Sequence, residues 1–150
     1  MRIKVNSNGK TKKGFTIVEL VVALAVVMIM SISATSVILM QNNTYRSTFY
    51  STEATNLAEN AIECFRFGVE NKSGVTIGEK QYTGVENIFK ATFAPTIGVE
   101  EGNLTLEGFQ YNGLDVEINI TETPEGSEKY VLSFVAKQDG KIVLEESYTK

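Results

Sequence analysis

Residues 12–40 read KKGFTIVELVVALAVVMIMSISATSVILM, and this stretch determines how the rest of the chain can fold. After the basic pair, the segment from Phe15 to Met40 contains one charged side chain, Glu19. As a helix, this segment would be about 39 Å long, which exceeds the roughly 30 Å hydrocarbon core of a bilayer. The segment is therefore long and apolar enough to cross a membrane.

The carboxylate of Glu19 is unusual at this position. An ionised group at membrane depth is costly, and it normally has a partner. The next basic residue along the chain is Arg46, which would lie about seven helical turns further on. We therefore expect the partner of Glu19 to come from elsewhere.

Charge is distributed unevenly around the apolar segment. The chain has a net charge of −4, but residues 1–14 contain five basic side chains and no acidic one. A basic stretch before an apolar span normally stays in the cytoplasm, so the expected topology is a single-pass protein of the cytoplasmic (inner) membrane with its head outside. The rest of the chain holds the excess of acid, which argues against direct binding of nucleic acid.

Metal and cofactor chemistry has few candidates. The 150 residues include one cysteine and no histidine, so an intrachain disulfide is impossible and the usual zinc and haem sites are almost excluded. Four acidic residues near predicted turns could bind calcium, but their spacing matches no calcium loop, and a solvated acidic rim is the preferred interpretation. They are Glu122, Glu125, Glu128 and Asp139. We predict no metal, cofactor or catalytic residue, and hence no enzyme.

The start of the apolar segment resembles the processing site of type IV prepilins and type II secretion pseudopilins. The shared features are the basic pair Lys12 and Lys13, then Gly14, Phe15 and Glu19, followed by continuous apolar sequence. The resemblance implies that a prepilin peptidase cuts between Gly14 and Phe15. It also implies that Phe15 becomes N-methylated and that the apolar helix stays in the product.

The same resemblance implies a role for Glu19 in assembly, as the partner of the N-terminal amine of a neighbouring subunit. A buried carboxylate and a buried ammonium each carry a desolvation penalty that pairing offsets. Geometry also permits Glu19 to pair with the new N-terminal amine of its own chain. The implied partners are the prepilin peptidase, other pilin or pseudopilin subunits, and the inner-membrane assembly platform with its ATPase.

The helical pattern continues beyond the apolar segment. Residues 41–66 contain no glycine or proline, and the first such residue is Gly68. Apolar side chains recur at spacings of three and four, which define one face of a helix. They are Ala54, Leu57, Ala58, Ala61, Ile62 and Phe65. Cys64 lies beside them in the sequence and is expected to be a small core residue. We predict one helix from Phe15 to about Phe67, apolar all round at first and amphipathic later.

A short polar stretch, residues 31–36, interrupts the apolar surface with serine and threonine. Small side chains ease close packing of helices, and we prefer this interpretation. Alternatively, their hydroxyls compete for backbone groups and soften the helix.

The C-terminal residues predict a small antiparallel sheet. Alternating apolar and polar side chains indicate three half-buried strands, and the short loops between them imply a meander. The inward residues are Leu114, Val116, Ile118 and Ile120, then Tyr130, Leu132, Phe134 and Ala136, then Ile142, Leu144 and Tyr148. The predicted turns are Pro124-Glu125-Gly126 and Gln138-Asp139-Gly140, the second being typical of a hairpin.

Residues 75–112 are less regular. Their apolar spacing predicts a short helix ended by Pro95, and two leucines predict a short strand. The helix residues are Val85, Ile88, Phe89 and Phe93, and the strand residues are Leu104 and Leu106. The expected fold class is α+β: a long N-terminal helix packed on a small antiparallel β-meander head, which is also the plan of pilins.

The predicted organisation has four parts. Residues 1–14 are a leader, 15–40 the membrane or filament-core half of the helix, 41–67 its amphipathic half, and 68–150 the head. The first functional hypothesis is a prepilin-like structural subunit of a type IV pilus or pseudopilus, serving adhesion, motility, DNA uptake or protein secretion. The alternatives are an uncleaved, single-span binding module and a secreted domain that starts near Ala34 after signal removal.

Overall fold

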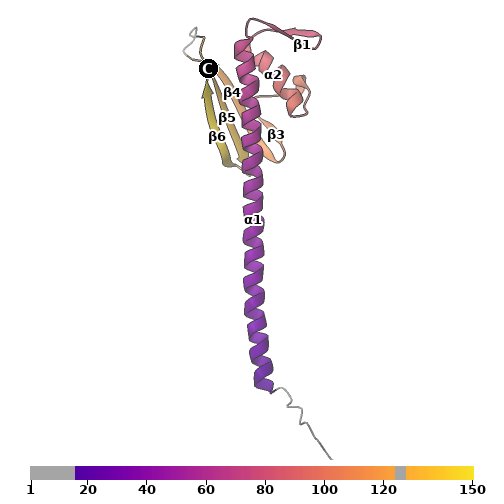
Figure 1. Cartoon of the computed structure of the whole chain (residues 1–150), viewed down its shortest axis with the longest axis vertical. Coiled ribbons are helices and arrows are strands. Elements are labelled where there is room, and N and C mark those ends of the chain that lie inside the picture. Colours follow the sequence, from indigo (N-terminus) through magenta and orange to yellow (C-terminus); the bar gives the residue numbers. More distant parts are fainter. Residues whose placement is uncertain (1–15, 124–127) are drawn as a thin grey trace, which may run out of the picture. The chain divides into compact units, whose positions relative to one another are not determined.

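Helix α1 runs without interruption from Ile17 to Glu70, a length of 54 residues (Figure 1). The computed structural model describes residues 16–123 and 128–150. These residues belong to two units, one that ends at Thr44 and one that extends from Tyr45 to Lys150, and α1 contributes to both.

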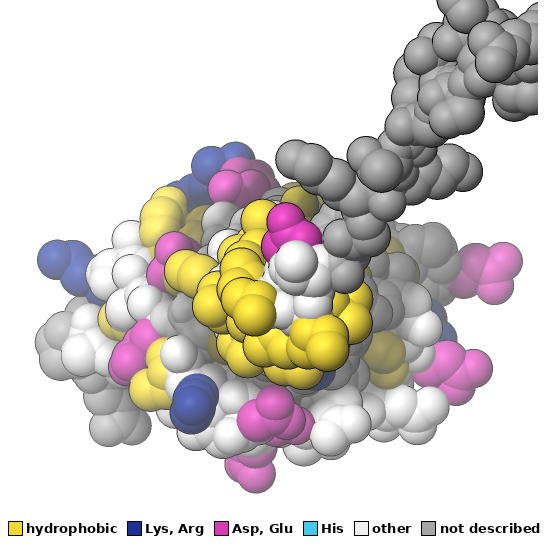
Figure 2. All heavy atoms as spheres, turned by 90° about the horizontal axis from the view of Figure 1, so that it is seen from below, with side chains coloured by type: hydrophobic (Ala, Val, Ile, Leu, Met, Phe, Trp, Pro, Cys, Tyr) yellow, Lys and Arg dark blue, Asp and Glu magenta, His cyan; other side chains and the backbone are white. Residues whose placement is uncertain are grey.

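In the first unit, the described residues expose their side chains on every side of the helix. All residues from Thr16 to Thr44 are exposed, and Ile17 and Met40 are among the large apolar ones. Figure 2, seen from below the view of Figure 1, shows hydrophobic side chains around most of the helix circumference. The four hydroxyls of residues 31–36 each donate to the carbonyl four residues earlier, at 2.8–3.0 Å. This part of α1 therefore presents an almost entirely apolar surface.

The second part of α1 buries one face. Its buried residues are Ala54, Leu57, Ala58, Ala61, Phe65 and Gly68, and Ile62 is half-buried. This is the amphipathic face that the sequence predicts, since residues three and four apart lie on the same side of a helix.

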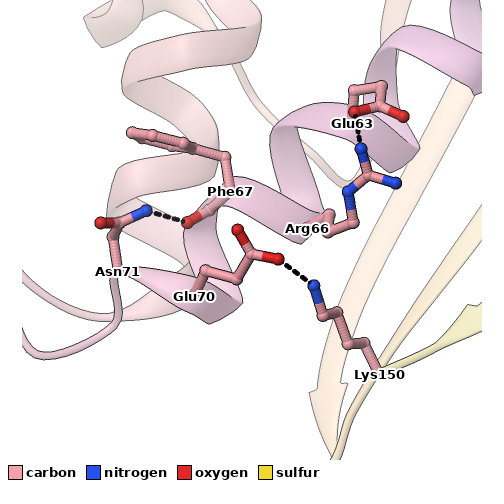
Figure 3. Close-up of polar contacts among 6 residues, drawn as sticks. All are labelled: Glu63, Arg66, Phe67, Glu70, Asn71 and Lys150. Carbon is pink, nitrogen blue, oxygen red and sulfur yellow. Dashed lines mark hydrogen bonds and ion pairs between the residues drawn. The ribbon is translucent and has the colours of Figure 1, made fainter.

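The helix passes through Gly68 and ends at Glu70, three residues beyond the predicted end at Phe67. Gly68 lies against the start of the next helix, and a Cβ there would come within 3.0 Å of the carbonyl oxygen of Val85. Packing thus outweighs the weak helix propensity of glycine. The helix then closes on Asn71, whose backbone N–H and side-chain amide both donate to the carbonyl of Phe67, at 3.1 and 2.9 Å (Figure 3).

The head contains a four-stranded antiparallel meander in the order β3-β4-β5-β6. The strands are β3 Phe109–Tyr111, β4 Leu114–Glu122, β5 Tyr130–Gln138 and β6 Lys141–Thr149. Each strand pairs with the next along the chain, and β4 pairs with β5 from Asp115↔Lys137 to Glu122↔Tyr130. The predicted α+β fold with a β-meander head is therefore confirmed. The turn predicted at residues 124–126 lies outside the described residues.

Two hairpins of this sheet use two-residue loops. The loop residues are Asn112-Gly113 between β3 and β4, and Asp139-Gly140 between β5 and β6, and all four have positive φ. Such mirror-image turns match the twist of the strands they join, and glycine, asparagine and aspartate tolerate them. Gly113 is also packed closely, because a Cβ there would lie 3.3 Å from the ring of Tyr50.

The chain between α1 and the meander forms smaller elements. They are the antiparallel pair β1 Val75–Ile77 and β2 Lys80–Tyr82, the helix α2 Val85–Thr96, and the 3₁₀ turn η1 Glu101–Asn103. Helix α2 is the predicted short helix, and Pro95 lies in its last turn. The hydroxyl of Tyr82 donates to Glu101 at 2.7 Å, which links β2 to η1.

The predicted strand at Leu104 and Leu106 is wrong. Leu104 follows η1, and Leu106 lies in a turn that closes with a hydrogen bond from Gly108 to Thr105. One backbone hydrogen bond, from Ile118 to Leu106 at 2.8 Å, joins this turn to β4. Both leucines are nevertheless buried and belong to the hydrophobic core.

Ile142 was expected on the inner face of the sheet, but 59 % of its surface is exposed. The register shifts at this point, since Ala136 pairs with Leu144 whereas Lys137 pairs with Ile142. The extra residue, Val143, forms a β-bulge, and a one-residue shift moves every preceding side chain of the strand to the other face. Val143 packs against the core instead.

One hydrophobic core joins α1, α2 and the sheet. Its largest fully buried side chains are Phe65, Phe89, Phe93, Phe134, Leu57, Ile88, Leu114, Leu132 and Val116. Phe89 and Phe93 stack at 5.0 Å between ring centroids, and Phe65 meets Tyr148 of β6 edge-on at 6.1 Å. The described residues include no buried charged side chain, so the head is held together mainly by apolar burial.

Candidate functional site: the N-terminal turn of the apolar helix

Glu19 lies in the first turn of α1, and Thr16 immediately precedes the helix. The backbone N–H of Thr16 donates to Oε2 of Glu19 at 2.9 Å, and the Thr16 hydroxyl donates to the same oxygen at 3.0 Å. In return, the backbone N–H of Glu19 donates to Oγ1 of Thr16 at 3.3 Å. These contacts form a capping box, in which the first and fourth residues satisfy each other's backbone N–H groups.

The capping box gives Glu19 a polar partner within its own helix. The first four N–H groups of any helix lack an intrahelical acceptor, and here the box satisfies two of them, those of Thr16 and Glu19. A carboxylate in the first turn also interacts favourably with the positive end of the helix dipole. The ion pairs found among residues 16–123 and 128–150 do not include Glu19, so its contacts there are hydrogen bonds from neutral groups.

Thr16 was not among the predicted site residues, because the expected partner of Glu19 was a basic group and Thr16 is neutral. The spacing Thr-x-x-Glu directly before an apolar run is the recognised signature of a capping box, so the signal was present in residues 16–19.

The other predicted site residues precede the described part of the chain. Lys12, Lys13, Gly14 and Phe15 lie outside residues 16–123 and 128–150, so their positions relative to Glu19 are not described. The processing site therefore stays a prediction from the sequence.

A hollow in the head has a volume of about 460 Å³ and is open to solvent. Three carboxylates line it, and two of them form ion pairs: Glu86 with Lys90 at 2.7 Å and Glu117 with Lys137 at 2.6 Å. Within residues 16–123 and 128–150, no group of three or more histidine, cysteine, aspartate or glutamate side chains is arranged to hold a metal ion.

The single cysteine is half-buried on α1, beside Thr92 and Thr96 of α2. Burial raises the pKa of the Cys64 thiol above its ordinary value, although both threonine hydroxyls act in the opposite direction. A raised pKa leaves less thiolate at neutral pH, and the thiolate is the reactive form. We therefore interpret Cys64 as a residue that packs between the helices and not as a reactive thiol.

Comparison with known proteins addresses the N-terminal region alone. Residues 9–35 match the family model described as the prokaryotic N-terminal methylation motif, which is the signature of type IV pilins and pseudopilins. No curated protein and no solved structure gives a significant match to the chain. The matched range includes both the capping box and the first part of the apolar surface of α1. The chain therefore carries the N-terminal signature of the type IV pilin and pseudopilin family, which supports a membrane-anchored, pilin-like structural subunit.

Proposed function

We propose that the chain is a prepilin-like subunit that is stored in the cytoplasmic membrane, cut between Gly14 and Phe15, and assembled into a type IV pilus or pseudopilus. The observation that carries this proposal is the methylation motif at residues 9–35, which overlaps a helix that is apolar on all sides. A prepilin peptidase would remove the leader and methylate Phe15. Other subunits, the assembly platform and its ATPase would be the later partners.

The membrane stage uses the first part of α1. The helix contains an 18-residue window of mean hydropathy 2.6, none of which is buried within the protein. A helix that is hydrophobic all round needs an apolar environment, which lipid supplies before assembly. The basic residues 1–14 would stay in the cytoplasm and the head would face outward.

The filament stage would exchange lipid for neighbouring helices around the same surface. Lipid tails and leucine or valine side chains are similarly apolar, so this exchange costs little hydrophobic free energy. Apolar packing alone leaves the axial position of one helix against another weakly determined. A charge pair at a fixed depth would determine it.

Glu19 would supply the acidic member of this pair. Cutting the Gly14–Phe15 bond creates an amine at Phe15, and methylation leaves it positively charged at neutral pH. A carboxylate and an ammonium in a low-dielectric environment attract each other strongly, and each avoids the penalty of being buried alone. The pair would therefore favour one axial register between subunits.

Glu19→Gln tests the proposed pair. Glutamine can still close a capping box, so the substitution removes the charge and keeps the local hydrogen bonds. We expect normal cleavage and methylation, but at least tenfold less of the variant in sheared filaments, measured by immunoblot against the membrane fraction. Glu59→Gln, at an exposed position of the second half of α1, is the matched control and should assemble normally.

Mass spectrometry of the N-terminus separates this proposal from its alternatives. A methylated Phe15 supports a prepilin-like subunit, an intact leader supports an uncleaved anchor, and a start near Ala34 supports a secreted domain. If Glu19→Gln enters filaments as efficiently as the unmodified protein, the proposed charge pair is refuted.

A further inference from the structure

We propose that Thr16 is a positioning residue for assembly: it holds one oxygen of Glu19 and leaves the other for the amine of a neighbouring subunit. This inference rests on the proposed function above. It concerns how the carboxylate is oriented, whereas the proposed function concerns what it binds.

The two oxygens of the Glu19 carboxylate differ in the hydrogen bonds that they accept. Both hydrogen bonds that Glu19 accepts from Thr16 go to Oε2, at 2.9 and 3.0 Å. Within residues 16–123 and 128–150, no hydrogen bond or ion pair reaches Oε1. A carboxylate oxygen has two acceptor positions, and an ammonium group is a strong donor to it. An approaching amine could therefore bind Oε1 while the capping box stays closed.

The hydroxyl of Thr16 behaves differently from the others of the apolar segment. Ser31, Ser33, Thr35 and Ser36 each donate to a backbone carbonyl of their own helix. The Thr16 hydroxyl instead donates to a charged side chain and accepts from a backbone N–H. Its position at the helix start allows both contacts, because the N–H groups there have no intrahelical acceptor.

The capping box is compatible with every stage of processing. The N–H of Thr16 belongs to the peptide bond between Phe15 and Thr16, whereas cleavage breaks the bond between Gly14 and Phe15. The box can therefore form in the precursor and persist in the mature subunit. Glu19 would then keep local partners in lipid and gain a charged one on assembly, without first losing a hydrogen bond.

Three substitutions of Thr16 separate positioning from helix capping. Thr16→Val keeps the shape of the side chain and the backbone N–H, but its side chain can neither cap the helix nor donate to Glu19. Thr16→Gly is nearly as good a cap as threonine and cannot donate through a side chain. Thr16→Ser can do both. We expect valine and glycine to lower incorporation about tenfold, as the loss of one hydrogen bond to a charged group allows, and serine to restore it.

The assay measures full-length protein expressed with its own assembly machinery. Filament-bound subunit is divided by methylated mature subunit, so an effect on the peptidase cancels. Thr35→Val is the matched control, because it removes a hydroxyl of the same helix that bonds only to the backbone. It should assemble normally.

The outcomes distinguish the two proposals. If Thr16→Gly assembles normally and Thr16→Val does not, Thr16 only caps the helix and the positioning role is refuted. The positioning role is also refuted if Thr16→Val assembles normally while Glu19→Gln is excluded, and in that case the charge pair stands. Normal assembly of Glu19→Gln refutes the charge pair itself.

Discussion

The two parts of α1 share one backbone conformation, but they differ in whether their side chains are buried. Residues 17–44 bury no side chain, whereas residues 45–70 bury a face that includes Leu57 and Phe65. The first part satisfies its hydroxyls with its own backbone, and the second part packs against α2 and the sheet. The second part packs its apolar face into the core of its own chain, whereas the first part leaves an apolar surface that needs lipid or other helices around it.

The same substitution in both parts should give the largest contrast. Leu57 is 2 % exposed in the core, and Leu57→Ala should lower the free energy of unfolding of the head by about 2–5 kcal/mol because it leaves a cavity. Leu24 is 51 % exposed in the apolar segment, and Leu24→Ala should leave that value unchanged. Near-ultraviolet circular dichroism of full-length protein in detergent micelles, followed through a chemical denaturant, measures both.

Equal effects of the two alanines would contradict this division of α1. In that case the apolar segment would contribute to the stability of the head, and the two units would not unfold independently. Assembly should show the opposite order of effects, since Leu24 is on the surface that is expected to meet other subunits.

Gly68→Ala should give the next largest effect, because it tests how closely the second part of α1 approaches α2. Alanine normally stabilises a helix interior relative to glycine by about 1 kcal/mol. Here its Cβ would lie 3.0 Å from the backbone carbonyl oxygen of Val85, so overpacking should reverse the sign. We expect a net loss of about 1 kcal/mol in the same unfolding measurement.

Gly102→Ala is the matched control for this prediction. A Cβ at Gly102 has open space around it, so the substitution should be nearly neutral. A stabilised Gly68→Ala variant would mean that α2 can move away without cost.

The sequence predicted the parts of the fold whose periodicity is long. Helix α1 and strands β4, β5 and β6 contain sustained patterns of period 3.6 or 2, and their types are correctly predicted. The hairpin between β3 and β4 was missed although Asn112-Gly113 is a strong turn signal, because β3 contains only three residues. The bulge at Val143 has no periodic signature, so the wrong face was assigned to Ile142.

The candidate site was predicted in a different way. Glu19 was conspicuous because one charge interrupts a long apolar segment, and the resemblance to prepilins gave it a role. Thr16 was not predicted, because the expected partner of a carboxylate at membrane depth was a basic group and Thr16 is neutral. Its contribution depends on the helix starting at Ile17, and the exact start of a helix is among the least certain features of a sequence prediction.

The smallest expected effect concerns the tie between the end of α1 and the sheet. The ammonium of Lys150, which follows β6, donates to the carboxylate of Glu70 in the last turn of α1 (Figure 3). This hydrogen bond, with the charge of Lys150, holds the pKa of Glu70 below its ordinary value of 4.5. Folding therefore favours the ionised form of Glu70, so its contribution is fully present above about pH 4.5 and is lost as the pH falls further.

Thermal unfolding of full-length protein in micelles, compared with Glu70→Gln, tests this dependence. At pH 7 the variant should melt slightly below the unmodified protein, and the difference should vanish as the pH falls below about 4.5, once Glu70 is protonated. The effect is small because both side chains are partly exposed, and high salt should reduce it further. A difference in melting temperature that persists at pH 3 would show that Glu70→Gln acts through packing. A difference that disappears both at low pH and at high salt would show that an ion pair joins the helix to the sheet.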